Sequence, residues 1–519
     1  RMKWQGDYHL NYNFQAPYYG SYSSNRLREF SQPLFEVIAR NIDKGLASAA
    51  DPDCIKSIES TWYWDTREDL HNGIQDAVLY PVGIKQYDVE FSSSYLNQTM
   101  NALFLASQVL SYYRYTLDEE WLFEEHKTPE GNSYTLYDFL VYDANFYAKW
   151  IEKKGLRIDE EYIKDSPAGL DGHALTKQHS RNYTEKYPDY TEEMGDDYCY
   201  VLYDGAHEGS FDFNPSVITG GVKNLMEALL EIGKEHAPSQ EKYETWQDIA
   251  DHIVGPEVTI FTRNGKEIFG LSEDRGIRSI SAPVNMEFVH PGDQLGFDSD
   301  PYLLEVGRNT MDQANWGSVN STPKAPTMAA RVQYDPDQLV SKINTYVVNK
   351  MRANYYVDDN THGWEKVGVL EALNNMMVQS DGGIIKVFPV WRDNYNGKFS
   401  TIREKGAFLV SSEMKNNTVQ YVELTSEKGT DAKLVNPWGS ANVTVTDSNG
   451  NKVEYTKGTT VNSGENTIEF QTQENMTYRI TEGGVDKTDL EDLYNQYKEE
   501  SSTGYVKETW EALQSALKQ

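Results

Sequence analysis

Acids, amides and aromatic residues come together in three short stretches that lie far apart in this sequence. The first, GDYHLNYN, carries Asn11 and Asn13, which alternate along the chain. In extended backbone both amides would point the same way and could hold a water or sugar hydroxyls. The second stretch is LYDGAHEGS, with Glu208 near its end, and the third is DDNTHGWEKVG, which starts at Asp358 and precedes a helical pattern. A buried polar turn or a set of solvated acids would explain each stretch taken alone.

Taken together, the second and third stretches favour acid and base chemistry. Glu208 lies beside Asp204 and His207 in a loop with glycines and aromatic residues, where desolvation raises the pKa of a carboxyl group and lets it protonate a leaving oxygen. The third stretch supplies the second carboxylate, from Asp359 or Glu365. One protonated and one ionised carboxyl group are what cleavage of a glycosidic bond requires, and inversion needs space for a water between them.

Other common chemistries lack their motifs. We find no His/Cys cluster with zinc spacing, no EF-hand loop, no GxGxxG or GxxxxGK[ST] phosphate cradle, and no G-x-S-x-G elbow. The net charge of −32 argues against nucleic acid or an anionic membrane surface as partner. We therefore expect no cofactor, although a calcium ion in the acidic stretch from 157 to 199 stays open.

Composition favours a globular chain that contacts sugars. The 519 residues exceed the usual size of a single core, and the 13 % aromatic share supplies rings that stack on sugars as readily as they fill a core. No run of 18 apolar residues is present. The two cysteines, Cys54 and Cys199, do not organise the fold, and sequence alone does not say whether they pair.

Hydrophobic periodicity divides the chain into three parts. Up to residue 383 we count eight helical stretches, including a first one from Leu27 to Leu46 that ends at an Asp51-Pro52 break, and two that begin at Asp300-Pro301 and Asp335-Pro336. This mainly α region suits a helical barrel with a site at one end. Residues 384–482 alternate with period two and predict a β-sandwich, with a turn at Asn449-Gly450. Residues 483–519 predict a short, charged helical module.

At the three loops the chain resembles the catalytic region of glycoside hydrolase family 95, the inverting α-L-fucosidases and α-L-galactosidases on an (α/α)6 barrel. The resemblance covers roughly residues 4 to 480 and rests on Asn11-Tyr12-Asn13, on YDGAHEGS and on VLEALNNMMVQSDGGIIKVFP. It implies that the Asn pair orients the attacking water and that Glu208 is the general acid. The family's D-G-N-F-G base loop is replaced here, so that Glu365 or, by counting back from Gly363, Asp359 takes the role of base.

The resemblance also implies a sugar pocket and a longer parent protein. We expect the pocket walls among aromatic and His residues of these loops and of two other stretches, namely Tyr8, His9, Trp62, Trp64, His207, His290, His362 and Trp364. Helices and a β-domain that precede the Asn pair in the family are absent, so we expect an N-terminal fragment of the same polypeptide to be missing. Residues 486–519 resemble the start of a FIVAR repeat, which implies a surface protein of a Gram-positive bacterium, extracellular or bound to the cell wall.

Three functions remain open on the sequence. The first is a secreted inverting exo-glycosidase that releases a terminal sugar, α-L-fucose or a related one, from an oligosaccharide or a glycoprotein glycan. The second is a non-catalytic glycan-binding module on the same scaffold. The third is a glycoside phosphorylase, for which the candidate loops offer few basic residues beyond Arg67 and Lys366.

Overall fold

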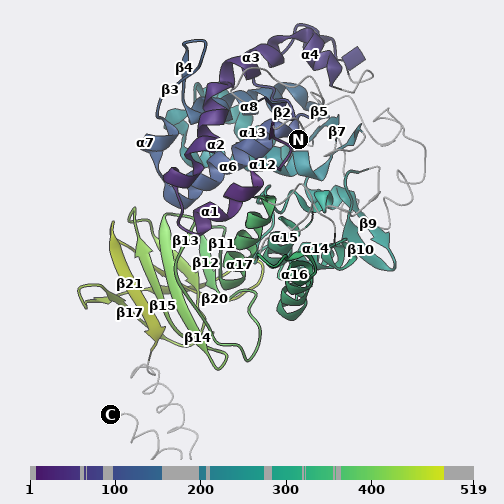
Figure 1. Cartoon of the computed structure of the whole chain (residues 1–519). Coiled ribbons are helices and arrows are strands. Elements are labelled where there is room, and N and C mark those ends of the chain that lie inside the picture. The colour runs from purple at the N-terminus through teal and green to yellow at the C-terminus, as the bar shows by residue number, and fades with distance from the viewer. Residues whose placement is uncertain are drawn as a thin grey trace, which may run out of the picture.

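Helices dominate the chain up to Met377 and strands dominate after it (Figure 1). The computed structural model describes residues 7–58, 64–65, 67–85, 98–154, 198–205, 211–273, 283–317, 321, 323–354, 357 and 364–483. The strand-rich part lies against one side of the helical part, below it in the view of Figure 1. Within the described residues, none of the helices has the length and apolar character needed to cross a membrane.

Each of the eight expected helical stretches is helical. The longer helices are α2 (Arg28–Arg40), α3 (Ile42–Ala50), α6 (Met100–Thr116), α8 (Leu136–Trp150), α12 (Ser216–Ile232), α13 (Gln240–His252), α14 (Pro301–Gln313), α16 (Pro336–Lys350) and α17 (Val369–Met377). Short ones are α1 (Tyr19–Ser23), α4 (Pro52–Ser57), α7 (Glu119–Leu122), α15 (Ala325–Arg331), η2 (Ala16–Tyr18), η3 (Glu68–Leu70), η5 (Lys234–His236), η6 (Pro256–Thr259), η7 (Val284–Met286) and η8 (Trp364–Gly368).

Five short antiparallel pairs connect these helices. They are β1 (Tyr8–His9) with β2 (Gly83–Ile84), β3 (His126–Lys127) with β4 (Ser133–Tyr134), β5 (Glu152–Lys154) with β6 (Cys199–Val201), β7 (Tyr203–Gly205) with β8 (Phe211–Phe213), and β9 (Ile260–Arg263) with β10 (Lys266–Phe269).

Local capping explains where several helices begin. The side chains of Asp300 and Asp335 accept hydrogen bonds from backbone N–H groups in the first turns of α14 and α16, each with Pro at the first helical position, as predicted. The expected break at Asp51-Pro52 is confirmed, since α3 ends at Ala50 and Asp51 has extended backbone; Asp51 then caps a further short helix, α4, in the same way. The single helix expected from Leu27 to Leu46 is two helices, since the chain leaves helical geometry at Asn41.

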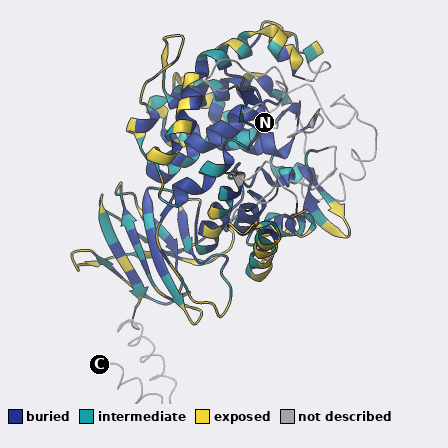
Figure 2. Ribbon diagram, in the orientation of Figure 1, coloured by how far each residue is buried: buried dark blue, intermediate teal, exposed yellow. Residues whose placement is uncertain are grey.

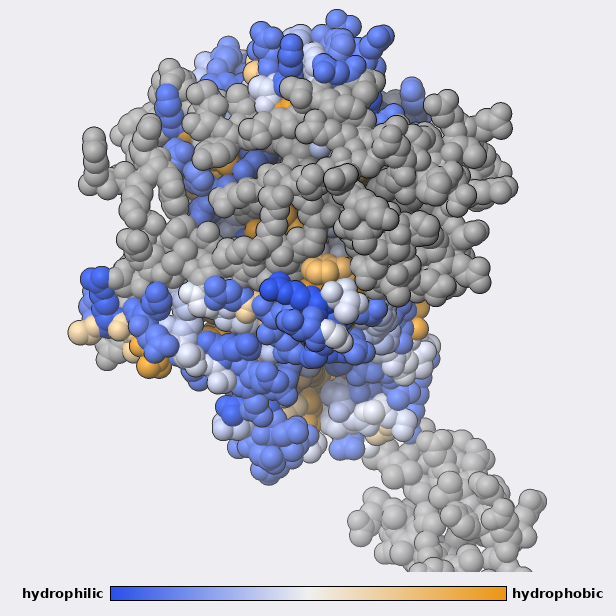
Figure 3. Space-filling model, turned by 90° about the vertical axis from the view of Figure 1, so that its right-hand side faces the viewer, coloured by the Kyte–Doolittle hydropathy of each residue, from blue (hydrophilic) through white to orange (hydrophobic). Residues whose placement is uncertain are grey.

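The main core lies among α6, α8 and α12, which are dark blue over most of their length in Figure 2. In α6, fifteen of seventeen residues are buried, so this helix is interior on nearly all sides. A second cluster, which includes Phe288, Met328 and Ala329, lies around η7, α14 and α15. On the side shown in Figure 3, the described surface is mostly hydrophilic, with small hydrophobic areas. The (α/α)6 closure of these helices stays a prediction.

The C-terminal domain consists of two sheets around its own core. One has the order β11-β12-β16-β20-β19 and the other β13-β14-β15-β21-β17-β18. The strands are β11 (Val378–Asp381), β12 (Ile384–Val387), β13 (Gly397–Glu404), β14 (Phe408–Lys415), β15 (Thr418–Ser426), β16 (Ala432–Val435), β17 (Val443–Asp447), β18 (Lys452–Val453), β19 (Thr456–Thr459), β20 (Asn466–Phe470) and β21 (Met476–Glu482).

Alternation along these strands follows the predicted pattern. In β15, for example, Val422 and Leu424 are fully buried while Glu423 between them is partly exposed. The hairpin at Asn449-Gly450 joins β17 to β18 as expected. The sheet nevertheless begins six residues before the predicted border at 384, because β11 directly continues α17 and pairs with β12.

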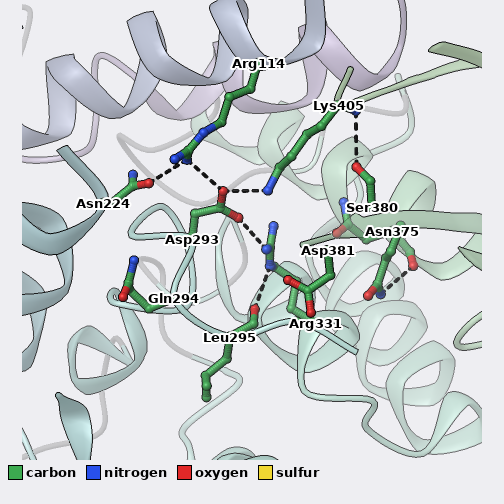
Figure 4. Close-up of polar contacts among 12 residues, drawn as sticks. Arg114, Asn224, Asp293, Gln294, Leu295, Arg331, Asn375, Ser380, Asp381 and Lys405 are labelled. Atoms are coloured by element: carbon green, nitrogen blue, oxygen red, sulfur yellow. Dashed lines mark hydrogen bonds and ion pairs between the residues drawn. The ribbon is translucent and has the colours of Figure 1, made fainter. Parts of the chain in front are cut away.

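Buried charges join the two domains at Asp293 (Figure 4). Its carboxylate accepts from Arg114 of α6 at 3.2 Å, from Lys405 of the β13–β14 turn at 2.6 Å, and from Arg331 at the end of α15. These three cations lower the pKa of Asp293 well below its usual range despite its burial. One carboxylate thus connects two helices to the β-domain.

We expect Asp293→Asn to destabilise the protein by about 2–4 kcal/mol, because it removes the counter-charge shared by three largely buried cations, of which Arg114 keeps a second partner, Glu231. Urea unfolding at pH 7 measures the change. Glu423→Gln is the matched control, since the Glu423–Arg479 pair is solvent-exposed at 3.4 Å and should contribute less than about 1 kcal/mol. Equal effects of the two substitutions would contradict the assigned role of Asp293.

Candidate active site

The Asn11–Asn13 stretch is a turn rather than extended backbone. Phe14 N–H donates to His9 C=O at 2.8 Å and Ala16 N–H to Tyr12 C=O at 2.9 Å, and Tyr12 has φ of +94°. The expected alternation of the two amides was therefore wrong, since the chain folds back immediately after β1. A residue other than Gly in this backbone region is strained, and such strain is typical of functional sites.

A hydrogen-bond path leads from this turn to the strand that enters the second candidate loop. Asn11, which is buried, donates through Nδ2 to Gln98 Oε1 at 3.3 Å. The next residue, Thr99, donates through its hydroxyl to Asp204 Oδ2 at 2.5 Å. Asp204 lies on β7, four residues before Glu208. Two stretches almost two hundred residues apart in sequence are thus held at the same end of α6.

Asp204 is a fully buried acid, so the alternative of solvated acids does not apply to this residue. Burial raises the pKa of its carboxyl group to about 7, although bonds from Thr99 and from the Gly205 N–H act against this. Nearby on α8, Asp143 is buried, and neither of its carboxyl oxygens has a hydrogen-bond partner among the described residues. Burial raises the pKa of Asp143 as well. The core under this strand therefore favours protonated acids.

The base of the second loop is fixed on both sides. Strand β7 pairs with β8, with Gly205 opposite Phe211. Behind the hairpin, Asn214 accepts from the Leu202 N–H at 3.1 Å and donates to Glu273 Oε2 at 2.7 Å. The residues between the strands, including His207 and Glu208, lie outside the described residues, so the role of Glu208 stays a prediction.

The third loop meets the first at Gly368. This glycine ends η8 and packs so closely that a Cβ would lie 2.7 Å from the Pro323 carbonyl oxygen and 3.1 Å from that of Ala16. The segment that carries Glu365 is thereby held against the end of the Asn11–Asn13 turn. Trp364 and Glu365 belong to η8, but their side chains, together with Asp359 and His362, lie outside the described residues.

A buried ion pair adjoins the turn, and sequence reasoning missed it. Lys324 donates to Glu287 where both side chains are almost completely buried, and the Lys324 ammonium lies 4.4 Å from the ring centroid of Tyr12. The two residues are 37 positions apart in unremarkable surroundings, so only the fold brings them together. The pair places a positive charge beside the middle residue of the Asn-Tyr-Asn turn.

The predicted pocket walls have different surroundings. Tyr8 packs on Phe14 with ring centroids 4.8 Å apart, and His9 Nδ1 lies 3.5 Å from Asp7; both adjoin the turn. Trp64 packs on His71 and against the main core. Trp62 lies outside the described residues.

His290 lies near the Asn11–Asn13 turn, because the Tyr19 ring that it contacts stacks on Tyr12. Its ring contacts Tyr19 and borders the small polar cavity near Asp293, and burial lowers its pKa to about 3. It is therefore a neutral imidazole between the two domains. Its contact with sugar stays a prediction.

Neither a metal cluster nor a disulfide is found in the described part of the chain. No group of three His, Cys, Asp or Glu residues there is arranged to hold a metal ion. Cys54 and Cys199 are free thiols. The acidic stretch considered for calcium lies almost entirely outside the described residues.

Comparison with known proteins gives the class. Two family models match, the glycosyl hydrolase family 95 catalytic domain over residues 1–163 and the glycoside hydrolase family 95 C-terminal domain over residues 379–480. Together they span just over half of the chain, and the second corresponds to the β-sandwich. These domains indicate a glycoside hydrolase. The chain thus carries regions that match both the catalytic and the C-terminal domain of glycoside hydrolase family 95.

Solved structures add only distant likenesses. A protein from the human microbiome described as a kojibiose phosphorylase is 9 % identical, with a TM-score of 0.40, and the match covers 76 % of this chain and 50 % of that one. A family 127 β-L-arabinofuranosidase from Geobacillus stearothermophilus T6 is 11 % identical, with a TM-score of 0.23 and coverage of 92 % and 78 %. No curated protein matches the sequence significantly.

We expect Asp204→Asn to remove one source of pH dependence from stability. The folded-state pKa of about 7 exceeds an unfolded value near 3.9, so this group's contribution is complete below about pH 4 and is lost as pH rises through 7. The amide oxygen can still accept from the Gly205 N–H, while the amide nitrogen, which takes the place of the oxygen that accepts from Thr99, can donate to the Thr99 hydroxyl.

Relative to wild type, the variant should therefore gain stability between pH 4 and 8, by up to about 4 kcal/mol for a shift of about three pKa units. Thermal unfolding of both proteins across this range measures the difference. Asp335→Asn, at an exposed helix cap, serves as the control. A difference that stays constant with pH would show that Asp204 is ionised in the folded protein.

Proposed function

We propose that this protein is an inverting exo-glycosidase. Glu208 protonates the leaving oxygen, and Glu365 or Asp359 acts as base on a water that Asn11 and Asn13 orient. The released sugar is α-L-fucose or a related sugar at the end of an oligosaccharide or a glycoprotein glycan. The protein acts outside the cell or on the cell wall of a Gram-positive bacterium, where residues 486–519 would form the start of a FIVAR repeat.

The convergence of the three stretches on one turn carries this proposal. Asn11 is linked through Gln98 and Thr99 to Asp204, which precedes Glu208. At the other end of the turn, Ala16 packs against Gly368, which lies three residues after Glu365. The second and third loops are thus held at the two ends of the turn. We therefore expect their acids to face each other across the Asn pair, which is the arrangement that inversion requires.

The surroundings of the Asn11–Asn13 turn also support the proposed glycosidase function. The buried Lys324–Glu287 pair and the aromatic rings of Tyr8 and Tyr12 give a rigid site with few exposed charges. Such a site suits a neutral sugar, since aromatic faces pack on its C–H groups.

We expect Glu208→Gln to lower kcat/KM about 10²–10⁴-fold on natural oligosaccharides, because the variant has no proton to donate to the leaving oxygen. The loss should be smaller on nitrophenyl glycosides, whose leaving group needs less protonation. Screening a panel of nitrophenyl glycosides and fucosylated oligosaccharides identifies the substrate first. Glu241→Gln, an exposed position on α13, is the matched control.

The same experiment separates the other two functions. A glycan-binding module would bind the glycans without hydrolysis by wild type or variant. A phosphorylase would need inorganic phosphate and would release a sugar phosphate. NMR of the first-formed anomer tests stereochemistry, and a product that retains the configuration of the substrate would contradict inversion.

We expect one of Glu365→Gln and Asp359→Asn to abolish hydrolysis while the other retains most of it, since only one carboxylate can act on the water. Glycan binding measured by calorimetry should survive in both variants, because uncharged amides preserve the shape of the pocket. Full activity in both variants would exclude this loop as the source of the base.

A further inference from the structure

A second pocket lies beside α16, and the proposed chemistry does not use it. Its volume is about 230 Å³, whereas a single water needs about 10–15 Å³. The lining comes from α16 and from the loop after α14, and includes Trp316, Lys342, Thr345, Tyr346, Asn349 and Lys350. The pocket is thus large enough for a group far bigger than water.

Helical spacing explains why α16 offers polar groups to this pocket. Lys342, Thr345 and Asn349 follow one another at intervals of three and four residues, so they share one face. Of the fifteen residues of α16 only Leu339 and Tyr346 are buried. The hydroxyl and amide groups on this face therefore remain available for hydrogen bonds.

Two aromatic rings form the apolar part of the pocket. Trp316 is held in place because its Nε1–H donates to the Met311 carbonyl at 2.9 Å. Tyr346, also in the lining, is 7 % exposed. A rigid indole beside hydroxyl and amide groups is a combination that binds a sugar ring, with C–H groups on the ring face and hydroxyls on the polar groups.

A positive charge distinguishes this pocket from the acidic rest of the chain. The Lys342 ammonium lies 4.9 Å from the Trp316 ring centroid, and no ion pair of Lys342 is found among the described residues. Asp312 attracts the Lys342 ammonium electrostatically, but its carboxylate is already bound by Lys266 at 2.9 Å and by the Tyr334 hydroxyl at 2.8 Å. Lys350 adds a second ammonium group in a chain of net charge −32.

We propose that this pocket binds an acidic sugar residue, with the ring on Trp316 and its carboxylate or sulfate ester on Lys342. The pocket adjoins the third candidate loop, since Lys366 of η8 lies 5.5 Å from the Tyr346 ring. An acidic unit of the same glycan could therefore be held here while its neutral end enters the candidate active site. The binding itself does not depend on the hydrolase function.

Binding to the full chain tests this site directly. The probes are D-glucuronic acid, glucose 6-sulfate, D-glucose, sodium acetate and sodium sulfate, each titrated and followed by saturation-transfer NMR. We expect saturable binding of the two acidic sugars and at least about tenfold weaker binding of glucose, because a charge-assisted hydrogen bond is lost. Comparison of glucuronate with the sulfate ester identifies the acidic group.

Variants locate the binding. Lys342→Gln and Trp316→Ala should each weaken glucuronate binding about tenfold or more, and Lys342→Arg should restore most of it. Thr345→Trp, at an exposed helix position, fills the pocket without removing a packing contact, so it keeps the test valid if Trp316→Ala fails to fold. Lys452→Gln, at an exposed strand position, is the control.

Several outcomes would overturn the proposal. If acetate or sulfate bound as tightly as glucuronate, the pocket would be an anion site that does not recognise the sugar ring. Glucose binding as tight as that of glucuronate, or glucuronate binding that survives both Lys342→Gln and Thr345→Trp, would place the interaction elsewhere. An absence of glucuronate binding would contradict the proposal. Hydrolysis lost through Glu208→Gln should leave this binding unchanged, so that failure of one proposal does not imply failure of the other.

Discussion

The Asp293 carboxylate is the contact on which the arrangement of the domains depends. It lies among Arg114, Arg331 and Lys405, which come from α6, α15 and the β13–β14 turn. At short range and away from water such contacts are strong, but each cation loses hydration when it is buried. A single anion shared by three cations is stable only in one geometry. The network therefore fixes the relative positions of the segments that contribute to it.

This constraint extends to the candidate active site, because α6 and α15 each have one end at Asp293 and the other end near the Asn11–Asn13 turn. In α6, Arg114 is near the C-terminus, while Gln98 and Thr99 precede the N-terminus. About 21 Å of helix lies between Met100 and Arg114. In α15, Arg331 is the last residue and Lys324, beside Tyr12, is the residue before the first. Two rigid helices thus transmit the position of the domain interface to the site.

The β-domain contributes further fixed points. The Asp298 carboxylate accepts from the N–H groups of Val461, Asn462 and Ser463, and Arg403 donates to the Tyr115 carbonyl at 3.1 Å. Because the helical part contacts the β-sandwich at several places, the β-sandwich acts as a support for it. None of its described residues needs to touch substrate for this role.

The sequence predicted what depends on local patterns. Capping at Asp300 and Asp335, the period-two strands and the Asn449-Gly450 hairpin all follow from neighbours in the chain. Prediction from the sequence failed where residues far apart in the chain determine the local structure. The turn at Asn11 is set by pairing with Gly83 and Ile84, α15 is a seven-residue helix too short to show a period, and Asp204 looks like any loop acid until Thr99 and the core enclose it. The Lys324–Glu287 pair gave no signal, since single charges far apart in sequence do not reveal a partner.

The buried acids also set opposite limits on the pH range of the fold. The pKa of Asp293 is depressed in the folded protein, so its contribution to stability is present above its unfolded value near 3.9 and is lost as pH falls. Asp204 and Glu404 behave in the opposite way, because burial raises their pKa values to about 7 and about 8. Their contributions are complete below about pH 4 and are lost as pH rises through those values. The contribution of Asp293 is thus lost in acid, whereas those of Asp204 and Glu404 are lost as pH rises through about 7 and about 8.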